Sequence, residues 1–159
     1  MTLESYFLLR MIHILGAVVV AGTGTGIAFF MYMASRSSNI AAIAVTARHV
    51  VLADWLFTAP AVATQFVTGV LLMYKLGYSF SSTWFYLVIA LFLFIGICWL
   101  PVLMIQYRLK SLAEASLVSG QLTPDFKKLM RYWVALGIPA FASVLIIFWL
   151  MVFKPFPVI

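Results

Sequence analysis

Apolar residues in this chain gather into long blocks, and short polar connections separate the blocks. Four apolar runs cover roughly residues 8–33, 50–74, 84–107 and 133–153. A helix needs about 20 predominantly apolar residues to cross a bilayer, and each run is long enough. The pattern predicts an all-α polytopic membrane protein: one antiparallel bundle of four transmembrane helices, residues 1–159, with no second domain.

The connection at residues 108–132 carries helical signals of its own. Leucines and alanines recur at helical spacing from 108 to 118, and Gly120 follows them. Thr123, Pro124 and Asp125 are typical of an N-cap, a first helical position and an acidic first turn. We therefore expect the fourth helix to begin near Pro124, outside the membrane, and to run into it.

Composition agrees with a membrane protein. The chain is 65% hydrophobic and 9% charged, whereas about a quarter of the residues in a soluble domain are charged. The net charge of +6 would also suit a nucleic-acid partner. The basic residues lie between the apolar runs, however, so they are better explained as signals that orient the helices in a lipid bilayer.

The positions of the basic residues predict that orientation. The first and third connections hold seven of them and the opposite side only three: Arg36, Arg48, Arg108, Lys110, Lys127, Lys128 and Arg131 against Arg10, Lys75 and Lys154. Cytoplasmic loops carry an excess of Lys and Arg. We therefore expect the first and third connections in the cytoplasm and both termini outside.

A polar stripe follows the second run. With about 100 degrees of rotation per residue, Thr58, Gln65 and Thr68 fall within about 60 degrees of Asp54. An aspartate at a helix centre costs roughly 2.5–3.5 kcal/mol to insert, so such residues normally face the bundle interior. The third run adds Trp99 and Gln106 at the same depth. We expect Asp54, Thr58, Trp99 and Gln106 to form a cluster, extended by Gln65.

Two interpretations of Asp54 remain open at this point. In one, Asp54 pairs with Lys110 at the membrane boundary and only anchors the helix. In the other, the stripe lines a polar pocket or an ion path. The second interpretation uses Gln65 and Thr68, because an anchor at the end of a helix does not require polar residues that reach mid-membrane.

The first run contains a histidine and a group of glycines, in RMIHILGAVVVAGTGTGIAFF. His13 begins a helix face that includes Gly16 and Gly24. Gly22 and Gly26 form a small-xxx-small pair, whose ordinary meaning is close helix packing. A nitrogen ligand above small residues also suits a flat ring, and histidine commonly holds haem iron. A lone membrane histidine is more often a hydrogen-bonded polar residue.

The stretches LLRMIHILGAVVVAGTGTGIAFFMYMASR, VVLADWLFTAPAVATQFVTG and ICWLPVLMIQYRLK resemble an uncharacterised family of bacterial integral membrane proteins. More distantly, the layout is similar to HemJ-type protoporphyrinogen oxidases and CopD-like proteins. This resemblance implies a four-helix protein of the bacterial inner membrane that binds haem b, with His13 as an axial ligand. The HemJ-type lysine of the third helix has no counterpart in 84–107, and Met73 and Met151, which lie at the depth of His13, are candidates for a second ligand.

Three functions follow as hypotheses. The first is a haem-binding redox protein, an oxidoreductase if it is an enzyme, with a quinone or porphyrin as partner. The second is a channel or carrier for ions or small solutes, lined by the Asp54 stripe and assembled as a homo-oligomer. The third is a non-catalytic accessory subunit of a membrane complex. The chain has no phosphate-binding loop, because GTGTG follows no strand and lies inside a membrane span.

Overall fold

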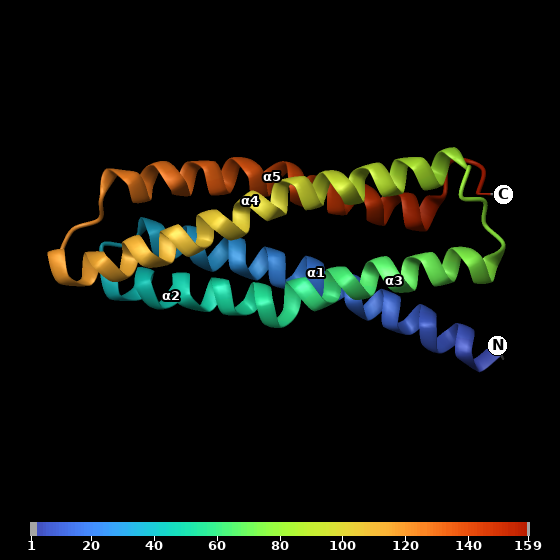
Figure 1. The fold of residues 1–159 in the computed structure, drawn as a ribbon, viewed down its shortest axis with the longest axis horizontal. Coiled ribbons are helices and arrows are strands. Elements are labelled where there is room, and N and C mark those ends of the chain that lie inside the picture. Colours follow the sequence, from blue (N-terminus) through green and yellow to red (C-terminus); the bar gives the residue numbers. More distant parts are fainter. Residues whose placement is uncertain (1–2, 159) are drawn as a thin grey trace.

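The computed structural model describes residues 3–158, and within that range it contains helices and no strands. Figure 1 shows the elements: α1 (Leu3–Arg36), α2 (Ile40–Ala53), the π-helical turn η1 (Asp54–Thr58), α3 (Ala59–Leu76), α4 (Thr83–Ser119) and α5 (Pro124–Phe153). Because α2, η1 and α3 form one continuous rod, the described chain has four helices long and apolar enough to cross a membrane. The predicted four-helix membrane fold is confirmed.

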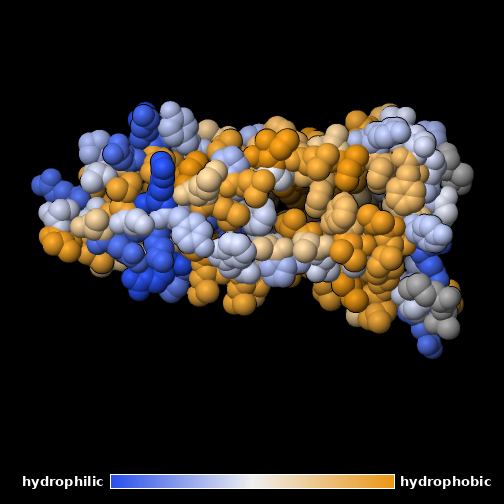
Figure 2. Space-filling model, in the orientation of Figure 1, coloured by the Kyte–Doolittle hydropathy of each residue, from blue (hydrophilic) through white to orange (hydrophobic). Residues whose placement is uncertain are grey.

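The bundle has two ends that differ in composition. The end with the connections 37–39 and 120–123 is termed the basic end, and the end with both termini and the connection 77–82 is termed the terminal end (Figure 1). Figure 2 shows hydrophilic residues gathered toward the two ends and hydrophobic residues over the middle. This distribution suits a bilayer around the middle of the bundle. Which side of the membrane each end faces stays a prediction.

The helix boundaries in the third connection follow the local sequence signals. The Thr123 side chain accepts a hydrogen bond from the backbone N–H of Phe126 at 3.3 Å, which caps the first turn of α5. Gly120 ends α4 with a φ of 71°, a left-handed conformation that glycine adopts without strain. The predicted start near Pro124 and the predicted stop at Gly120 are both confirmed.

Two helices are longer than the predicted spans. The α2 helix begins at Ile40, where the Asn39 side chain accepts from the N–H of Ala42 at 3.0 Å, so residues 40–49 are helical and the first connection is short. The α4 helix continues to Ser119 without a break after residue 107. At 1.5 Å per residue its 37 residues span about 55 Å, more than the roughly 30 Å of a hydrocarbon core. The basic end therefore extends beyond the bilayer.

A π-helical turn interrupts the second rod at Asp54, just before a proline. Pro60 has no N–H and its ring crowds the carbonyl four residues earlier, so a regular α-helix is disfavoured there. The backbone N–H of Ala59 instead bonds to the carbonyl of Asp54, five residues back. Such bulges are rare and frequently lie at functional sites. The turn rotates Asp54 and Thr58 relative to the rest of the rod, and both are buried.

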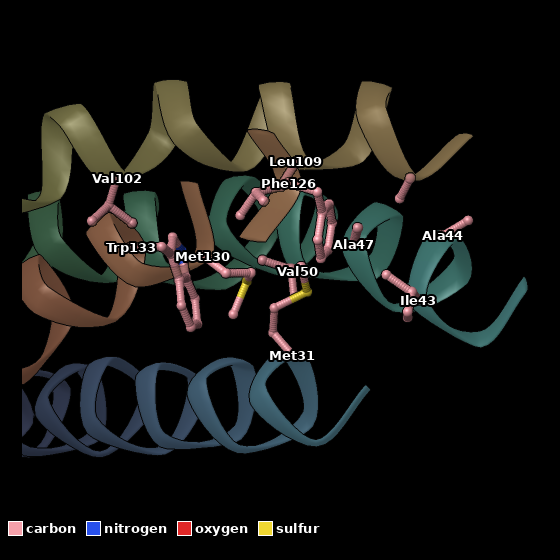
Figure 3. Close-up of a cluster of buried hydrophobic side chains, with 11 residues drawn as sticks. Met31, Ile43, Ala44, Ala47, Val50, Val102, Leu109, Phe126, Met130 and Trp133 are labelled. Carbon is pink, nitrogen blue, oxygen red and sulfur yellow. The ribbon is translucent and has the colours of Figure 1, made fainter. Parts of the chain in front are cut away.

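The largest apolar core lies at the basic end and is built by all four rods (Figure 3). We term it the basic-end core. Its members are Met31, Ile43, Ala44, Ala47, Val50, Val102, Leu109, Ala113, Phe126, Met130 and Trp133. Leu109 and Phe126 are almost completely buried. Because this core begins where α4 and α5 leave the hydrocarbon region, water exclusion stabilises part of it as in a soluble protein.

The rods separate toward the terminal end. There α3 packs on α1 but does not closely approach α4 or α5 along the backbone, and the Phe66 and Phe92 rings stack across the gap with centroids 6.0 Å apart. A second small core of Met73, Trp84 and Leu150 closes the end. Between the two cores lies a mostly apolar cavity of about 100 Å³, to which Gln65 and Trp99 contribute.

Candidate functional site

Three of the buried polar residues lie on η1 and on α4. Asp54 keeps 4% of its surface exposed, Thr58 7% and Gln106 3%. Trp99, seven residues before Gln106 on α4, is partly buried and lines the cavity. The structure thus places all four residues of the expected cluster on the interior side of the bundle, while Gln65 lies farther along α3 and lines the same cavity as Trp99.

Five buried polar atoms in this region have no hydrogen-bond partner in the described part of the chain. They are Asp54 Oδ2, Thr58 Oγ1, Trp99 Nε1, Gln106 Oε1 and Trp133 Nε1. More than nine in ten buried polar groups in folded proteins have a partner, so five orphans in one region need an explanation. The five residues are termed the inner polar cluster. Their free donors and acceptors are groups that a polar ligand or ordered water would satisfy.

A contact between helices places Asp54 and Gln106 at a similar level of the bundle. Trp55 Nε1 donates to the Tyr107 hydroxyl at 2.7 Å, which joins η1 to α4 one residue from Asp54 and one residue from Gln106. Trp133 packs in the basic-end core beside the α4 residues on either side of Gln106. Sequence reasoning missed Trp133, which marked only the start of the fourth run. The sequence signal that could have indicated Trp133 was its place at the start of the fourth run, on the helix antiparallel to the helix of Gln106.

Among residues 3–158 no cationic side chain forms an ion pair with Asp54. The ion pair among residues 3–158 joins Arg48 to Glu114 at 3.1 Å, and both side chains are exposed. The Asp54–Lys110 pair, which one of the two interpretations required, is not formed in the described part of the chain. Lys110 lies one helical turn beyond Gln106 on α4, but its ammonium group does not come within bridging distance of the carboxylate. The anchor interpretation of Asp54 loses the contact on which it depended.

His13 lies in the terminal half of the bundle, where its side chain forms a hydrogen bond with Thr68 of the polar stripe. Its Nδ1 lies 2.8 Å from Thr68 Oγ1, and the Thr68 hydroxyl donates to the carbonyl of Thr64. Since that hydroxyl proton is already used, Nδ1 carries the imidazole proton and donates it to Thr68. Nε2 then has a free lone pair. A ring nitrogen fixed in this way is the usual arrangement of a metal-bound histidine.

The small residues beside His13 do not form an empty groove. A Cβ added at Gly16 would lie 2.5 Å from Nε2 of Gln65, whose amide donates to the backbone carbonyl of His13. Gly69 closely approaches the imidazole ring, and a Cβ there would lie 3.4 Å from its Cε1. Nothing lies within 4 Å of a Cβ position at Gly24. Gly16 therefore serves the α1–α3 contact, and Gly24 does not contribute to it.

Haem fits this region only in part. His13 Nε2 has the chemistry of an axial ligand, but Met73 packs with Trp84 and Leu150 in the terminal core. The cavity near His13 is about 100 Å³, and pockets that bury a drug-sized ligand hold about 300–1,000 Å³. Within residues 3–158 no three His, Cys, Asp or Glu side chains gather as metal ligands. One copy of this chain does not enclose a porphyrin.

Fold and site together define a class: an integral membrane protein of four helices with unpaired polar groups inside the bundle. The chain belongs to the family described as predicted integral membrane protein (DUF2269), whose model matches residues 7–155. The expected membership of an uncharacterised membrane family is thereby confirmed. No curated protein and no solved structure matches the chain. The more distant similarity to HemJ-type and CopD-like proteins stays a prediction.

Proposed function

We propose that this protein is a small membrane carrier or channel that binds a cation at the inner polar cluster. The observation that carries the proposal is the set of five buried polar atoms without partners. Each such atom costs a fold about 1–3 kcal/mol when it is left unpaired. The chain keeps a carboxylate, an amide, a hydroxyl and two indoles unpaired despite this cost in stability. Their retention supports a role in binding a ligand.

The chemistry of the cluster favours a cation over an anion. Asp54 supplies a carboxylate oxygen, and Thr58 and Gln106 supply neutral oxygens. Oxygen ligands of this kind suit hard cations and ammonium groups. No lysine or arginine of the described chain neutralises Asp54, so its charge is available to a ligand. The indole N–H groups of Trp99 and Trp133 would donate to water or to a polar group carried with the cation.

A route from this site toward the terminal end follows the stripe. Beyond the inner polar cluster lies the cavity, whose lining is apolar apart from Gln65 and Trp99. Gln65, Thr68 and His13 then continue the polar contacts toward the terminal end. The apolar stretch is a barrier to a bare ion, and the loose packing of α3 leaves room for the rods to move. A four-helix chain is small for a carrier, so we expect a homo-oligomer in the bacterial inner membrane.

Substitution of Asp54 by asparagine tests this function. Purified protein in proteoliposomes is assayed for uptake of Na⁺, K⁺ and methylammonium and for proton flux with an internal pH dye. We expect the wild type to conduct at least one of these probes. Asp54→Asn keeps the shape and removes the charge, and we expect a loss of about thirtyfold or more, in line with about 2 kcal/mol for a buried charge that loses its partner.

Glu114→Gln is the matched control, because it makes the same chemical change at an exposed acid on α4. Its flux should equal that of the wild type. A wild-type protein that is monomeric and passes none of the probes would contradict the carrier proposal. Equal flux in Asp54→Asn and the wild type would leave transport standing but remove Asp54 from the path.

The hydrogen bond of His13 to Thr68, which leaves Nε2 of the imidazole free, favours haem binding as a second candidate function. Thr68 fixes the proton on Nδ1 and leaves Nε2 free to ligate iron. Since the space inside one copy is small, a haem b held there would lie on the lipid-facing side of the bundle or between two copies. A quinone or porphyrin would be the redox partner in that case, and His13 would hold and orient the ring.

Visible spectra of protein from haem-rich cells test this second function. The wild type should show a Soret band, and His13→Ala should lose it because the ligand atom is gone. His49→Ala is the control, since His49 is exposed at the opposite end of the bundle. A colourless wild type, or a Soret band retained in full by His13→Ala, would contradict His13 as a haem ligand.

A further inference from the structure

A groove whose lining includes charged residues lies between α4 and α5 at the basic end, outside the inner polar cluster. Its volume is about 630 Å³, within the range of ligand pockets. Eight residues line it: Tyr107, Arg108, Ser111 and Leu112 of α4, and Asp125, Lys128, Leu129 and Tyr132 of α5. We term it the interfacial groove. Figure 2 shows hydrophilic residues around this end of the molecule.

The three charged groups of the interfacial groove have no partner in the described part of the chain. Arg108, Lys128 and Asp125 are exposed, and none of them forms an ion pair or hydrogen bond with the described residues 3–158. Lys128 stands three residues after Asp125 on one helix, a spacing that allows a pair. The pair is nevertheless absent. Two cationic groups and one anionic group therefore face the groove with their charges free for a ligand.

The interfacial groove lies at the ends of the third and fourth apolar runs, where the sequence predicts the level of lipid headgroups. Tyr107 ends the third apolar run, and Tyr132 directly precedes the fourth. Tyrosines at such positions mark the boundary between hydrocarbon and water. From Tyr132 toward water, Lys128 comes one turn farther out on α5, and Asp125 lies in the first turn. The groove thus presents rings at the membrane side, cations next, and a carboxylate at the water side.

We propose that the interfacial groove binds a phospholipid whose headgroup is a phosphodiester with a primary ammonium, as in phosphatidylethanolamine. Arg108 and Lys128 bind the phosphate, and Asp125 accepts hydrogen bonds from the ammonium group farther out. In a bilayer the ammonium of this headgroup also lies on the water side of the phosphate. Basic pockets between membrane helices commonly bind lipid headgroups, and the free carboxylate selects a zwitterionic lipid over an anionic one.

Native mass spectrometry of the full chain in detergent tests this site. Delipidated protein is titrated with phosphatidylethanolamine, phosphatidylcholine and phosphatidylglycerol that carry the same acyl chains. We expect half-saturation by phosphatidylethanolamine at an about fivefold lower concentration than by either of the others, the size of effect that one exposed charge contact produces. Phosphatidylcholine cannot donate hydrogen bonds from its ammonium, and phosphatidylglycerol has no cation for Asp125.

Three variants distinguish specific binding in the interfacial groove from non-specific attraction of the lipid by basic residues. Asp125→Asn should reduce the preference for phosphatidylethanolamine to about onefold, and because this is a ratio within one variant, a change in helix stability does not affect it. Lys128→Gln should weaken binding of all three lipids, because it removes one of the two cations that bind the phosphate. Lys127→Gln removes the same charge as Lys128→Gln, but Lys127 does not line the groove, so its binding should match the wild type.

Three outcomes would overturn the proposal. The first is equal binding of the three lipids by the wild type. The second is a loss in Lys127→Gln as large as the loss in Lys128→Gln, which would mean that charge alone attracts the lipid. The third is displacement of the lipid by an equal concentration of soluble phosphoethanolamine, which would assign the groove to a free metabolite. None of these outcomes depends on transport, so this proposal stands or falls separately from the proposed function.

Discussion

Replacing Phe126 with alanine should lower the free energy of unfolding by about 3–5 kcal/mol, the range for truncation of a buried phenylalanine. Phe126 is 1% exposed and packs in the basic-end core in the first turn of α5. That turn precedes the fourth apolar run, so the cavity would open where packing is driven by water exclusion as well as by van der Waals contact. Denaturant unfolding in detergent micelles, followed by tryptophan fluorescence, measures the change, and Trp133 in the same core is a local probe.

Leu117→Ala is the control for this experiment. Leu117 lies on α4 at the same end of the molecule but is 50% exposed, so its truncation should change the free energy of unfolding by about 0.5 kcal/mol or less. If Phe126→Ala changed the free energy of unfolding as little as Leu117→Ala, the basic-end core would not contribute to the stability of the protein.

The sequence predicted the helices well because their signals are local. Apolar runs, Gly120 after the third helix and Thr123 before the fourth each act within one or two turns. The helical start at Ile40 was not predicted. Residues 40–49 are rich in alanine and are interrupted by Arg48 and His49 before the second apolar run; in the structure Asn39 caps this segment and it packs against α4.

For the candidate site, the sequence predicted which side chains point into the bundle but not which residues they contact. Rotation along a helix indicated that Asp54 and Gln65 point inward, because that rotation is a property of one helix. The partners of these residues depend on the register between helices, which no single helix encodes. The sequence therefore did not reveal that Gln65 fills the space at Gly16, or that Thr68 holds the His13 ring. The π-turn at Asp54 was missed for a related reason, since Pro60 signals a disturbance but not its form.

The inner polar cluster and the π-turn occur together, and both are unfavourable taken alone. A π-turn sacrifices regular α-helical bonding, and an unpaired buried carboxylate lowers stability. Asp54 is the first residue of that turn, and its backbone carbonyl accepts the bond that closes the turn. Sites at which a fold departs from its most stable form are typically functional, because activity and stability place different demands on the same residues.

Replacing Asp54 with leucine should therefore stabilise the protein, by about 1–3 kcal/mol when no cation is added. Leucine has the same branching and the same number of side-chain heavy atoms as aspartate, removes the unpaired Oδ2 and can pack against the neighbouring basic-end core. The same variant should have no cation flux, since the charge is gone. Thermal or denaturant unfolding in detergent measures the gain, and Asp54→Ala is the comparison, because it removes the same oxygen but leaves a cavity and should gain less.

A loss of stability in Asp54→Leu would contradict the proposal that the Asp54 carboxylate is unpaired. It would show that the carboxylate has partners in the native protein, for example internal waters that also bond to Thr58 or Gln106, and that Asp54 supports the bundle. A gain in stability together with a loss of flux cannot come from an anchor, because removing an anchor destabilises the helix it holds. The sign of this one free-energy change therefore separates the two interpretations of Asp54.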